Sequence, residues 1–226
     1  RCNYFIKLIM SNFNMMPLFC SPIAVTEIDK DVCSSLKNLA TKVTWFAKGE
    51  HKDLGYSVSK DTNILVADAA TTGGGKAINT KNNLYNYFAS YCQNYIKELS
   101  FDCDIQLTTS WFSRTEPGGR SGHISNYNSW YTAVVFFDEE YSKDCGDTEF
   151  YRDNHGPFPT SDPAKYNIYS ADYFPLLPQY RAMLIYPSSL KYRINVNRSN
   201  EFRRSFQFNI MPKGRIGTGE YVFNYK

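Results

Sequence analysis

The stretch "LIYPSSLKYRINVNRSNEFRRSFQFNI", residues 184–210, holds two short apolar runs joined by a polar connector, and its alternation points to strands. Side chains alternate between the two faces of a strand, so each run divides into two sets. The first run gives one set of Tyr192, Ile194 and Val196 and another of Lys191, Arg193 and Asn195. We therefore expect Tyr192 to point inward as a core residue whose hydroxyl finds a hydrogen-bond partner.

The second run of this stretch divides in the same way. One set is Arg203, Ser205 and Gln207, and the other is Arg204, Phe206 and Phe208. The phenylalanines belong to a core. The polar set then faces either a polar pocket inside the protein or the solvent, and the alternation alone leaves both open.

Working outward, the second half of the chain repeats such runs, separated by Pro, Gly, Asn and Asp. The predicted strands are "DIQLTTSWF" (104–112), "SWYTAVVFFD" (129–138), "DTEFYRD" (147–153), "YRAMLIYP" (180–187), "LKYRINVN" (190–197), "RRSFQFNIM" (203–211) and "GEYVFNY" (219–225). Short strands with this punctuation are typical of a sandwich or barrel of antiparallel strands.

Two helices are predicted before the strands. Asp29 is a plausible N-cap for the first, whose apolar residues follow helical spacing, and the second runs from about Lys81 to Leu99. The apolar residues of the first are Val32, Leu36, Leu39, Val43 and Phe46, and those of the second are Leu84, Phe88, Tyr91, Tyr95, Ile96 and Leu99. The fold class is mainly β (α+β), a jelly roll buttressed by two N-terminal helices.

We expect a single domain over residues 1–226. It divides into a peripheral segment (1–15), a helical buttress (16–103) and a β core (104–226). Residues 47–82 are predicted to be irregular, apart from "NILVAD" (63–68), a strand or a connecting piece. The "TTGGGK" at 71–76 is not a phosphate loop, because Ala70 and Ala77 stand where that motif requires glycine and a hydroxyl.

Composition gives no positive signal for several classes of protein. A net charge of +3 is too mild to indicate nucleic-acid or membrane binding. The six cysteines form no C-x-x-C pair and have no companion histidines, so neither a zinc knuckle nor a redox motif is supported. A reduced, cytoplasmic protein is the simplest expectation. The N-R-S at 197–199 is a glycosylation sequon by spelling only.

Four motifs resemble one family of 2-oxoglutarate and Fe(II)-dependent oxygenases, common in phages and marine bacteria. "YPSSLKYRINVNRSNEFRRSFQFNIMPKGRIG" (186–217) is similar to its C-terminal signature, F-P-S-W-L-x-H-x-V-x-P-N followed by R-x-S-x-S-F-N. "SWFSRTEPGGRSGHISNYNSWYTAVVFF" (110–137) is similar to its tryptophan strand and H-x-H-P-N-S segment. "GDTEFY" (146–151) and "MPLFCSPIAVTEID" (16–29) resemble further elements in the same order. The resemblance implies a double-stranded β-helix.

The resemblance also shows which residues stand at the metal-ligand positions. Fe(II) in this family is held by two histidines and a carboxylate. The two early histidine positions fall on Ile124 and Asn126, and the late one falls on Tyr192. None is a good Fe(II) ligand, because isoleucine has no donor atom, an asparagine oxygen is weak and a phenol binds well only as its anion.

Other candidates for a rearranged metal site are few. His123 lies one residue from an aligned position, but a slip of one residue turns a side chain to the opposite face of a strand. His51 and His155 lie in loop sequences and are more simply turn or solvated histidines. Asp147 and Glu149 could supply carboxylates.

Arg203 and Ser205 match the R-x-S with which the family grips the distal carboxylate of 2-oxoglutarate, a role that suits a guanidinium backed by a hydroxyl. The competing interpretation is that Arg203 and Arg204 are a solvated surface pair.

Two functions follow. The favoured one is an oxygenase-like protein that has lost its metal site and serves, without a cofactor, as a binding or structural module, for instance in a phage particle. It implies protein partners or self-association and a cytoplasmic or virion location. The alternative is an active dioxygenase that uses Fe(II) and 2-oxoglutarate at a rearranged site. Substrate, partner and oligomeric state stay open.

Overall fold

A computed structural model describes residues 21–47, 51–65, 75–152, 171–217, 220 and 222–225. Its helices are α1 (Lys30–Ala40) and α2 (Gly75–Glu98). Its strands are β1 (Ala24–Glu27), β2 (Trp45–Phe46), β3 (Tyr56–Ser59), β4 (Asp104–Thr115), β5 (Tyr131–Val135), β6 (Thr148–Tyr151), β7 (Tyr173–Leu176), β8 (Ala182–Pro187), β9 (Tyr192–Ile194), β10 (Arg203–Ile216) and β11 (Phe223–Tyr225).

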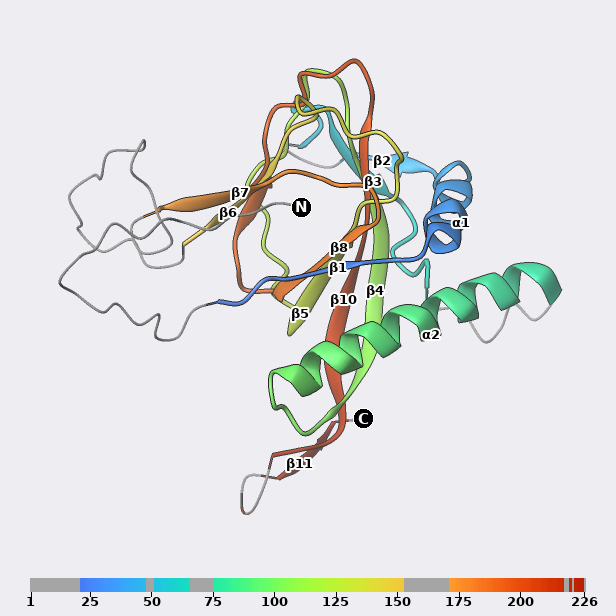
Figure 1. Ribbon diagram of the computed structural model, residues 1–226, viewed down its shortest axis with the longest axis vertical. Coiled ribbons are helices and arrows are strands. Elements are labelled where there is room, and N and C mark those ends of the chain that lie inside the picture. The colour runs from blue at the N-terminus through green and yellow to red at the C-terminus, as the bar shows by residue number, and fades with distance from the viewer. Residues whose placement is uncertain are drawn as a thin grey trace.

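The strands form two antiparallel sheets, as the alternating runs predict (Figure 1). The large sheet has the order β1-β8-β5-β10-β4-β3-β2, with β11 added to the end of β10. The small sheet has the order β7-β6-β9, and Ile124 adds a bridge to Tyr192 at its β9 edge. Strands distant in sequence are neighbours in both sheets, which is the topology of a jelly roll. The predicted fold class is confirmed.

The helices cover the outer face of the large sheet. Figure 1 shows α2 lying across β4 and β10, with α1 nearer to β2 and β3. Phe88 of α2 packs against two side chains of β10, Phe206 at 6.0 Å and Phe208 at 5.0 Å between ring centroids. All three are completely buried, so the helix stripe is core, as its spacing predicts.

Of three local predictions about the helices, two are wrong in detail and one is confirmed. The first helix ends at Ala40, and Phe46 lies in β2, where it pairs with Val58, because an apolar residue at helical spacing serves a strand equally well. Asp29 occupies the N-cap position, as predicted, although its side chain makes no capping bond. The second helix begins at Gly75, six residues before the predicted start at Lys81.

The stretch predicted as irregular contains β3, which pairs with β4. Of "NILVAD", Asn63 makes a single bridge to Ser110, and Ile64 and Leu65 are buried; residues 66–68 lie outside the described part of the chain. The short polar strand was missed because its partners in β4, from Ser113 to Thr115, lie more than fifty residues away in the sequence.

One hydrophobic core lies beneath the helices, and a second lies between the two sheets. Its buried members are Val134, Phe136, Phe150, Leu184, Tyr186 and Tyr192. The alternation predicted for the opening stretch is correct, since Tyr192 and Ile194 are buried and Arg193 is partly exposed. The sequon asparagine, Asn197, is also fully buried, and its amide donates to the carbonyls of Thr115 and Glu201.

Within the described residues, neither helix is long and apolar enough to cross a membrane.

Candidate functional site

The face of β10 that looks into the jelly roll is polar. Arg203, Ser205 and Gln207 are 1–2% exposed, whereas Phe206 and Phe208 on the opposite face pack beneath α2. Of the two possibilities that the sequence left open, exposure to solvent is therefore wrong, and this polar face lies inside the protein. The surface-pair interpretation is wrong for Arg203; Arg204 is the partly exposed member and binds Asp138 through two hydrogen bonds.

The structure brings together the three positions that the resemblance assigns to metal ligands. Ile124 and Tyr192 are bridge partners whose backbone amides donate to each other's carbonyls at 2.7 and 3.0 Å. Ile124 packs against the core between the sheets, and the Asn126 amide donates to the buried Thr132 hydroxyl at 3.1 Å. The three side chains offer one apolar group, one amide and one phenol.

Tyr192 starts a chain of hydrogen bonds that crosses the interior. Its hydroxyl donates to Oε1 of Gln207 at 3.0 Å, and Nε2 of Gln207 donates to the Ser113 hydroxyl at 3.0 Å. The hydroxyls of Ser113 and Ser205 are 2.8 Å apart. These four side chains are thus bonded to one another, as buried polar groups generally are.

Burial raises the pKa of Tyr192 well above 10, and the neighbouring Tyr186 and Tyr56 raise it further. A phenol binds a metal well as its anion. Tyr192 is neutral at physiological pH and acts as a hydrogen-bond donor to Gln207.

Removing this donor tests the network. Tyr192→Phe should lower the free energy of unfolding by about 1.5 kcal/mol, because it leaves the buried Gln207 oxygen without its partner. Denaturant titration measures the loss. The control is Tyr127→Phe, which removes a hydroxyl from a side chain that is 84% exposed and should change nothing. Equal effects of the two variants would show that the interior network contributes no stability.

The raised pKa of Tyr192 also predicts a loss of stability at alkaline pH. The folded-state pKa of Tyr192 is raised, so its contribution is complete below the unfolded value of about 10 and is lost as the pH rises above it. The slope is about 1.4 kcal/mol per pH unit for each tyrosine that stays neutral only when folded. Denaturant titrations above pH 10 should show this fall in the free energy of unfolding. Tyr192→Phe should reduce the slope by the share of one tyrosine, about 1.4 kcal/mol per pH unit. An unchanged slope in that variant would contradict the assignment.

Neither of the described histidines, His51 and His123, makes a hydrogen bond to this network. His123 is exposed, and its ring packs edge-on against Tyr151 at 4.8 Å. His51 lies beside Tyr56 with ring centroids 5.1 Å apart, and its Nδ1 is buried without a hydrogen-bond partner. His155 lies outside the described residues.

The candidate carboxylate Glu149 is bound elsewhere. It is held by Arg193 at 2.5 Å and by the hydroxyl of Tyr151 at 2.7 Å, both on its own side of the small sheet. Thr148 and Phe150, its neighbours in β6, point to the opposite face toward the interior. Across the described ranges, no group of three histidine, cysteine or acidic side chains is placed to hold a metal ion.

Arg203 is the most unusual residue of the interior. Its Nε donates to the carbonyl of Gly146 at 2.9 Å and its Nη2 to the hydroxyl of Thr148 at 2.7 Å, while the guanidinium lies 5.4 Å from the centre of the Phe136 ring. In the part of the chain that the structure describes, no carboxylate pairs with it. Burial therefore lowers the pKa of this guanidinium.

A further polar group beside Arg203 is unpaired. Thr115 lies opposite Arg203 in the β4–β10 register, is completely buried and has a hydroxyl without a hydrogen-bond partner. A buried charge that has only neutral partners would be stabilised by an anion.

The family uses Fe(II) and 2-oxoglutarate, and the residues present suit these two groups differently. The positions assigned to iron ligands hold a side-chain set that cannot bind Fe(II), so iron does not fit. A carboxylate suits Arg203 and the nearby Ser205, which supply a guanidinium and a hydroxyl.

Sequence reasoning missed the partners of Tyr192 and Arg203. Gln207 and Ser113 could have been found, because Gln207 shares a face of β10 with Ser205 and Ser113 is the partner of Ser205 on β4. Gly146 and Thr148 could not, since they approach Arg203 from a separate sheet.

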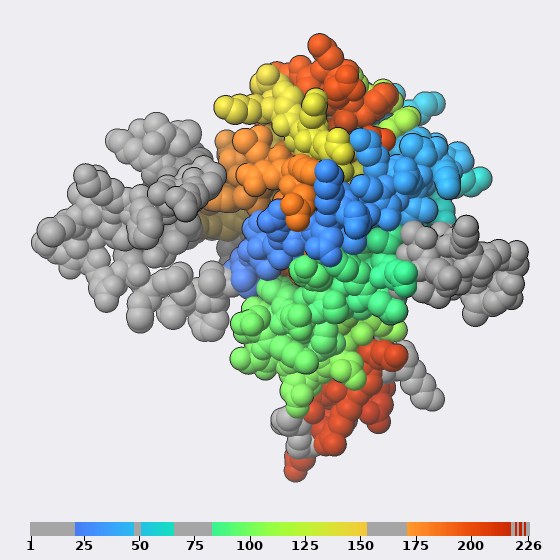
Figure 2. All heavy atoms as spheres, turned by 45° about the vertical axis from the view of Figure 1, so that its right-hand side comes forward, coloured from blue at the N-terminus to red at the C-terminus, as the bar shows by residue number. Residues whose placement is uncertain are grey.

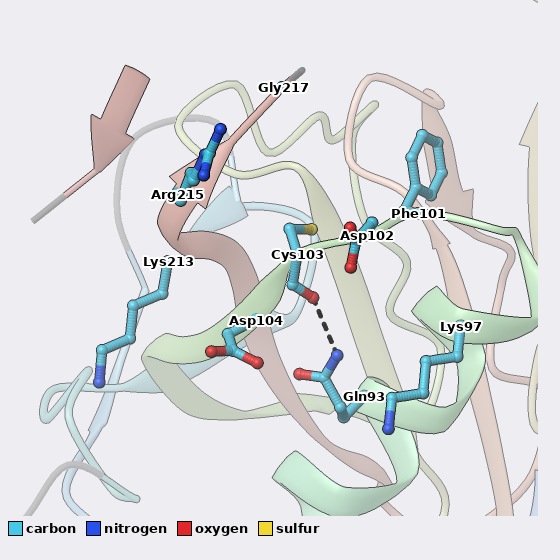
Figure 3. Close-up of a pocket in the computed structure, with 9 residues that line it drawn as sticks. All are labelled: Gln93, Lys97, Phe101, Asp102, Cys103, Asp104, Lys213, Arg215 and Gly217. Atoms are coloured by element: carbon cyan, nitrogen blue, oxygen red, sulfur yellow. Dashed lines mark hydrogen bonds between the residues drawn. The ribbon is translucent and has the colours of Figure 1, made fainter. Parts of the chain in front are cut away.

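One surface pocket, of about 530 Å³, is remote from this interior (Figure 3). It lies where Gln93 of α2 donates to the carbonyl of Cys103, and its other side is formed by Lys213 and Arg215 near the end of β10. Lys213 is ten residues from Arg203 along the strand, about 33 Å. The pocket is therefore separate from the interior site.

Comparison with known proteins shows which solved structures share this fold. The sequence matches no protein-family model and no curated protein. Among solved structures, the chain is similar to an oxidoreductase of the 2OG-Fe(II) oxygenase family from Burkholderia pseudomallei, with a TM-score of 0.56, 9% identity and 83% of each chain covered.

Two further structures are similar to the same extent. A prolyl-4-hydroxylase from Pseudomonas putida has a TM-score of 0.54 and 10% identity, with 85% of this chain and 93% of that chain covered. HygX from Streptomyces hygroscopicus, with nickel and 2-oxoglutarate bound, has a TM-score of 0.54 and 8% identity, with 85% and 83% covered. The chain has the jelly-roll fold of the 2-oxoglutarate and Fe(II)-dependent oxygenases.

Proposed function

We propose that this chain is an oxygenase-like protein that works without iron, as a binding or structural module. The observation that carries the proposal is the set Ile124, Asn126 and Tyr192 at the positions expected for metal ligands. The Tyr192 hydroxyl is hydrogen-bonded to Gln207, and its side chain places a phenol ring in the interior at the position where the family has an imidazole. A fold can persist after the chemistry of its site is gone.

The proposed setting is a protein assembly, such as a phage particle, in which the chain is bound to partners or to copies of itself. The framework that would be kept for this purpose is the pair of sheets. Neither a nucleic acid nor a membrane is part of the proposal, since the net charge is only +3.

A metal-binding experiment tests the proposal. Protein purified without chelators should contain no bound iron, and Mn(II) or Ni(II) with 2-oxoglutarate should leave its melting temperature unchanged, because a ligand that binds only the folded state must raise it. Stoichiometric metal in the purified protein, or a shift that requires metal and 2-oxoglutarate together, would contradict it.

The active dioxygenase is the second candidate, and Arg203 favours it. A completely buried guanidinium with no carboxylate partner among the described residues, close to Ser205, is suited to the distal carboxylate of 2-oxoglutarate. Conversion of 2-oxoglutarate to succinate in the presence of Fe(II), lost in His123→Ala, would support this candidate with a rearranged site. No succinate above a heat-denatured control would exclude it.

A further inference from the structure

A cavity of about 340 Å³ opens between two loops next to Arg203. One loop follows β5 and contributes residues between Glu139 and Cys145; the other precedes β10 and contributes Ser199, Glu201 and Phe202. The backbone amide of Arg198 donates to the carbonyl of Asp144 at 2.7 Å, which ties the loops together. Figure 2 shows these loops, yellow and red-orange, side by side at the top of the molecule.

The inner wall of this cavity carries a positive charge that no carboxylate among the described residues pairs with. It includes Arg203 and the buried Cys145. Arg203 uses Nε and Nη2 for neutral oxygens, and Nη1 makes no hydrogen bond within the described residues. Because the side chain is 2% exposed, a carboxylate that reached Nη1 would meet a poorly hydrated donor, where a charge-assisted bond is strong.

The rim carries the opposite charge. Glu139, Glu140 and Glu201 line the cavity and are exposed. Glu139 has a long contact with Lys37 at 3.9 Å, and the other two have no ion pair within the described chain. Such a rim repels a dianion and attracts a cation.

We infer that this cavity binds a small zwitterion of the α-amino acid class. The carboxylate of the ligand reaches Arg203 at the inner wall, and its ammonium group stays between Glu140 and Glu201 at the rim. Ser142 and Ser199 add hydroxyls and Phe202 adds an apolar wall for the remainder of the ligand. The volume lies at the low end of the range for small-molecule pockets, which suits a single amino acid.

The inference goes beyond the proposed function, because it depends on the cavity and not on the absence of iron. It also differs from the grip on 2-oxoglutarate. A dicarboxylate has no group for the glutamate rim, whereas a zwitterion satisfies both charges of the cavity.

The test is calorimetric titration of the full chain, in EDTA, with each of the twenty proteinogenic L-amino acids. At least one should bind saturably, and the matching acid without its amine and the matching amine without its carboxylate should each bind at least 10-fold more weakly. The double variant Glu140→Gln, Glu201→Gln should weaken binding about 10-fold. The double variant Glu98→Gln, Glu116→Gln removes two exposed charges outside the cavity and should leave binding unchanged.

The glutamate variants lie on the surface, so their result stands even if Arg203→Lys does not fold. Where Arg203→Lys folds, it should lose most of the binding, because lysine cannot supply the planar fork. No saturable binding by any amino acid, equal binding of the deaminated acid, or full affinity in the glutamate double variant would overturn the inference. Binding of 2-oxoglutarate alone would also overturn it and would support the dioxygenase candidate, while metal content tests the iron-free proposal separately.

Discussion

The triple variant Ile124→His, Asn126→Asp, Tyr192→His should bind Co(II) on the order of 100-fold more tightly than the unchanged chain. The reason is geometric. Ile124 and Tyr192 are bridge partners, and Asn126 lies two residues further along with its amide on the buried Thr132. Two imidazoles and a carboxylate at these positions would face a common point between the sheets, which is the ligand set that Fe(II) and Co(II) take in such folds.

Cobalt is the probe because its visible absorption reports the coordination directly. The matched control keeps the first two changes but replaces Lys191→His instead of Tyr192→His. Lys191 is adjacent in sequence, exposed and turned to the other face, so the control has the same ligands without convergence. Equal Co(II) affinity in the two variants, each confirmed as folded by its melting curve, would show that the three positions do not form one site.

Gly146→Ala should lower the free energy of unfolding by about 4 kcal/mol. Gly146 has a φ of +83°, which costs an L-residue about 1–2 kcal/mol. An added Cβ would also overlap the carbonyl oxygen of Asn195, and this atom belongs to the backbone and cannot rotate away. Relief of the overlap, worth a further 1–3 kcal/mol, would displace the carbonyl that accepts from Arg203.

Gly118→Ala is the control for Gly146→Ala. Gly118 has a φ of +76°, but an added Cβ would meet nothing within 4 Å, so only the backbone strain remains. We expect a loss of about 1–2 kcal/mol by denaturant titration. The difference between the two variants measures the close approach of Gly146 to the β9–β10 connection, and a difference near zero would mean that this loop relaxes freely.

The alternation of the opening stretch gave the most reliable inference from sequence. Tyr192 and Ile194 are inside as expected, and Arg203, Ser205 and Gln207 share one face. This works because a strand period of two is enforced by the backbone and does not depend on distant partners.

The sequence could not decide which face of β10 was the interior. Both faces are buried, one against α2 and the other against the small sheet, and a strand buried on both sides shows no polar side to solvent. The environment of Arg203 depends on Gly146 and Thr148, more than fifty residues earlier. Contacts of that kind leave no local signal.

The boundaries of short elements were predicted least well. β2 and β3 together occupy six residues, and nothing in the spacing of Phe46 separates a helix from a strand. What distinguishes them is the pairing of β3 with β4, a tertiary contact.

The buried amide of Asn197 has a practical consequence for producing this protein. The side chain holds the carbonyls of Thr115 and Glu201 and accepts from Ser199, so it has no room for a sugar. A host that attaches glycans to N-R-S before folding would modify the atom that closes this connection. Bacterial cytoplasmic expression avoids the conflict, and a secretory eukaryotic host would require Ser199→Ala, which removes the acceptor sequence while leaving the asparagine in place.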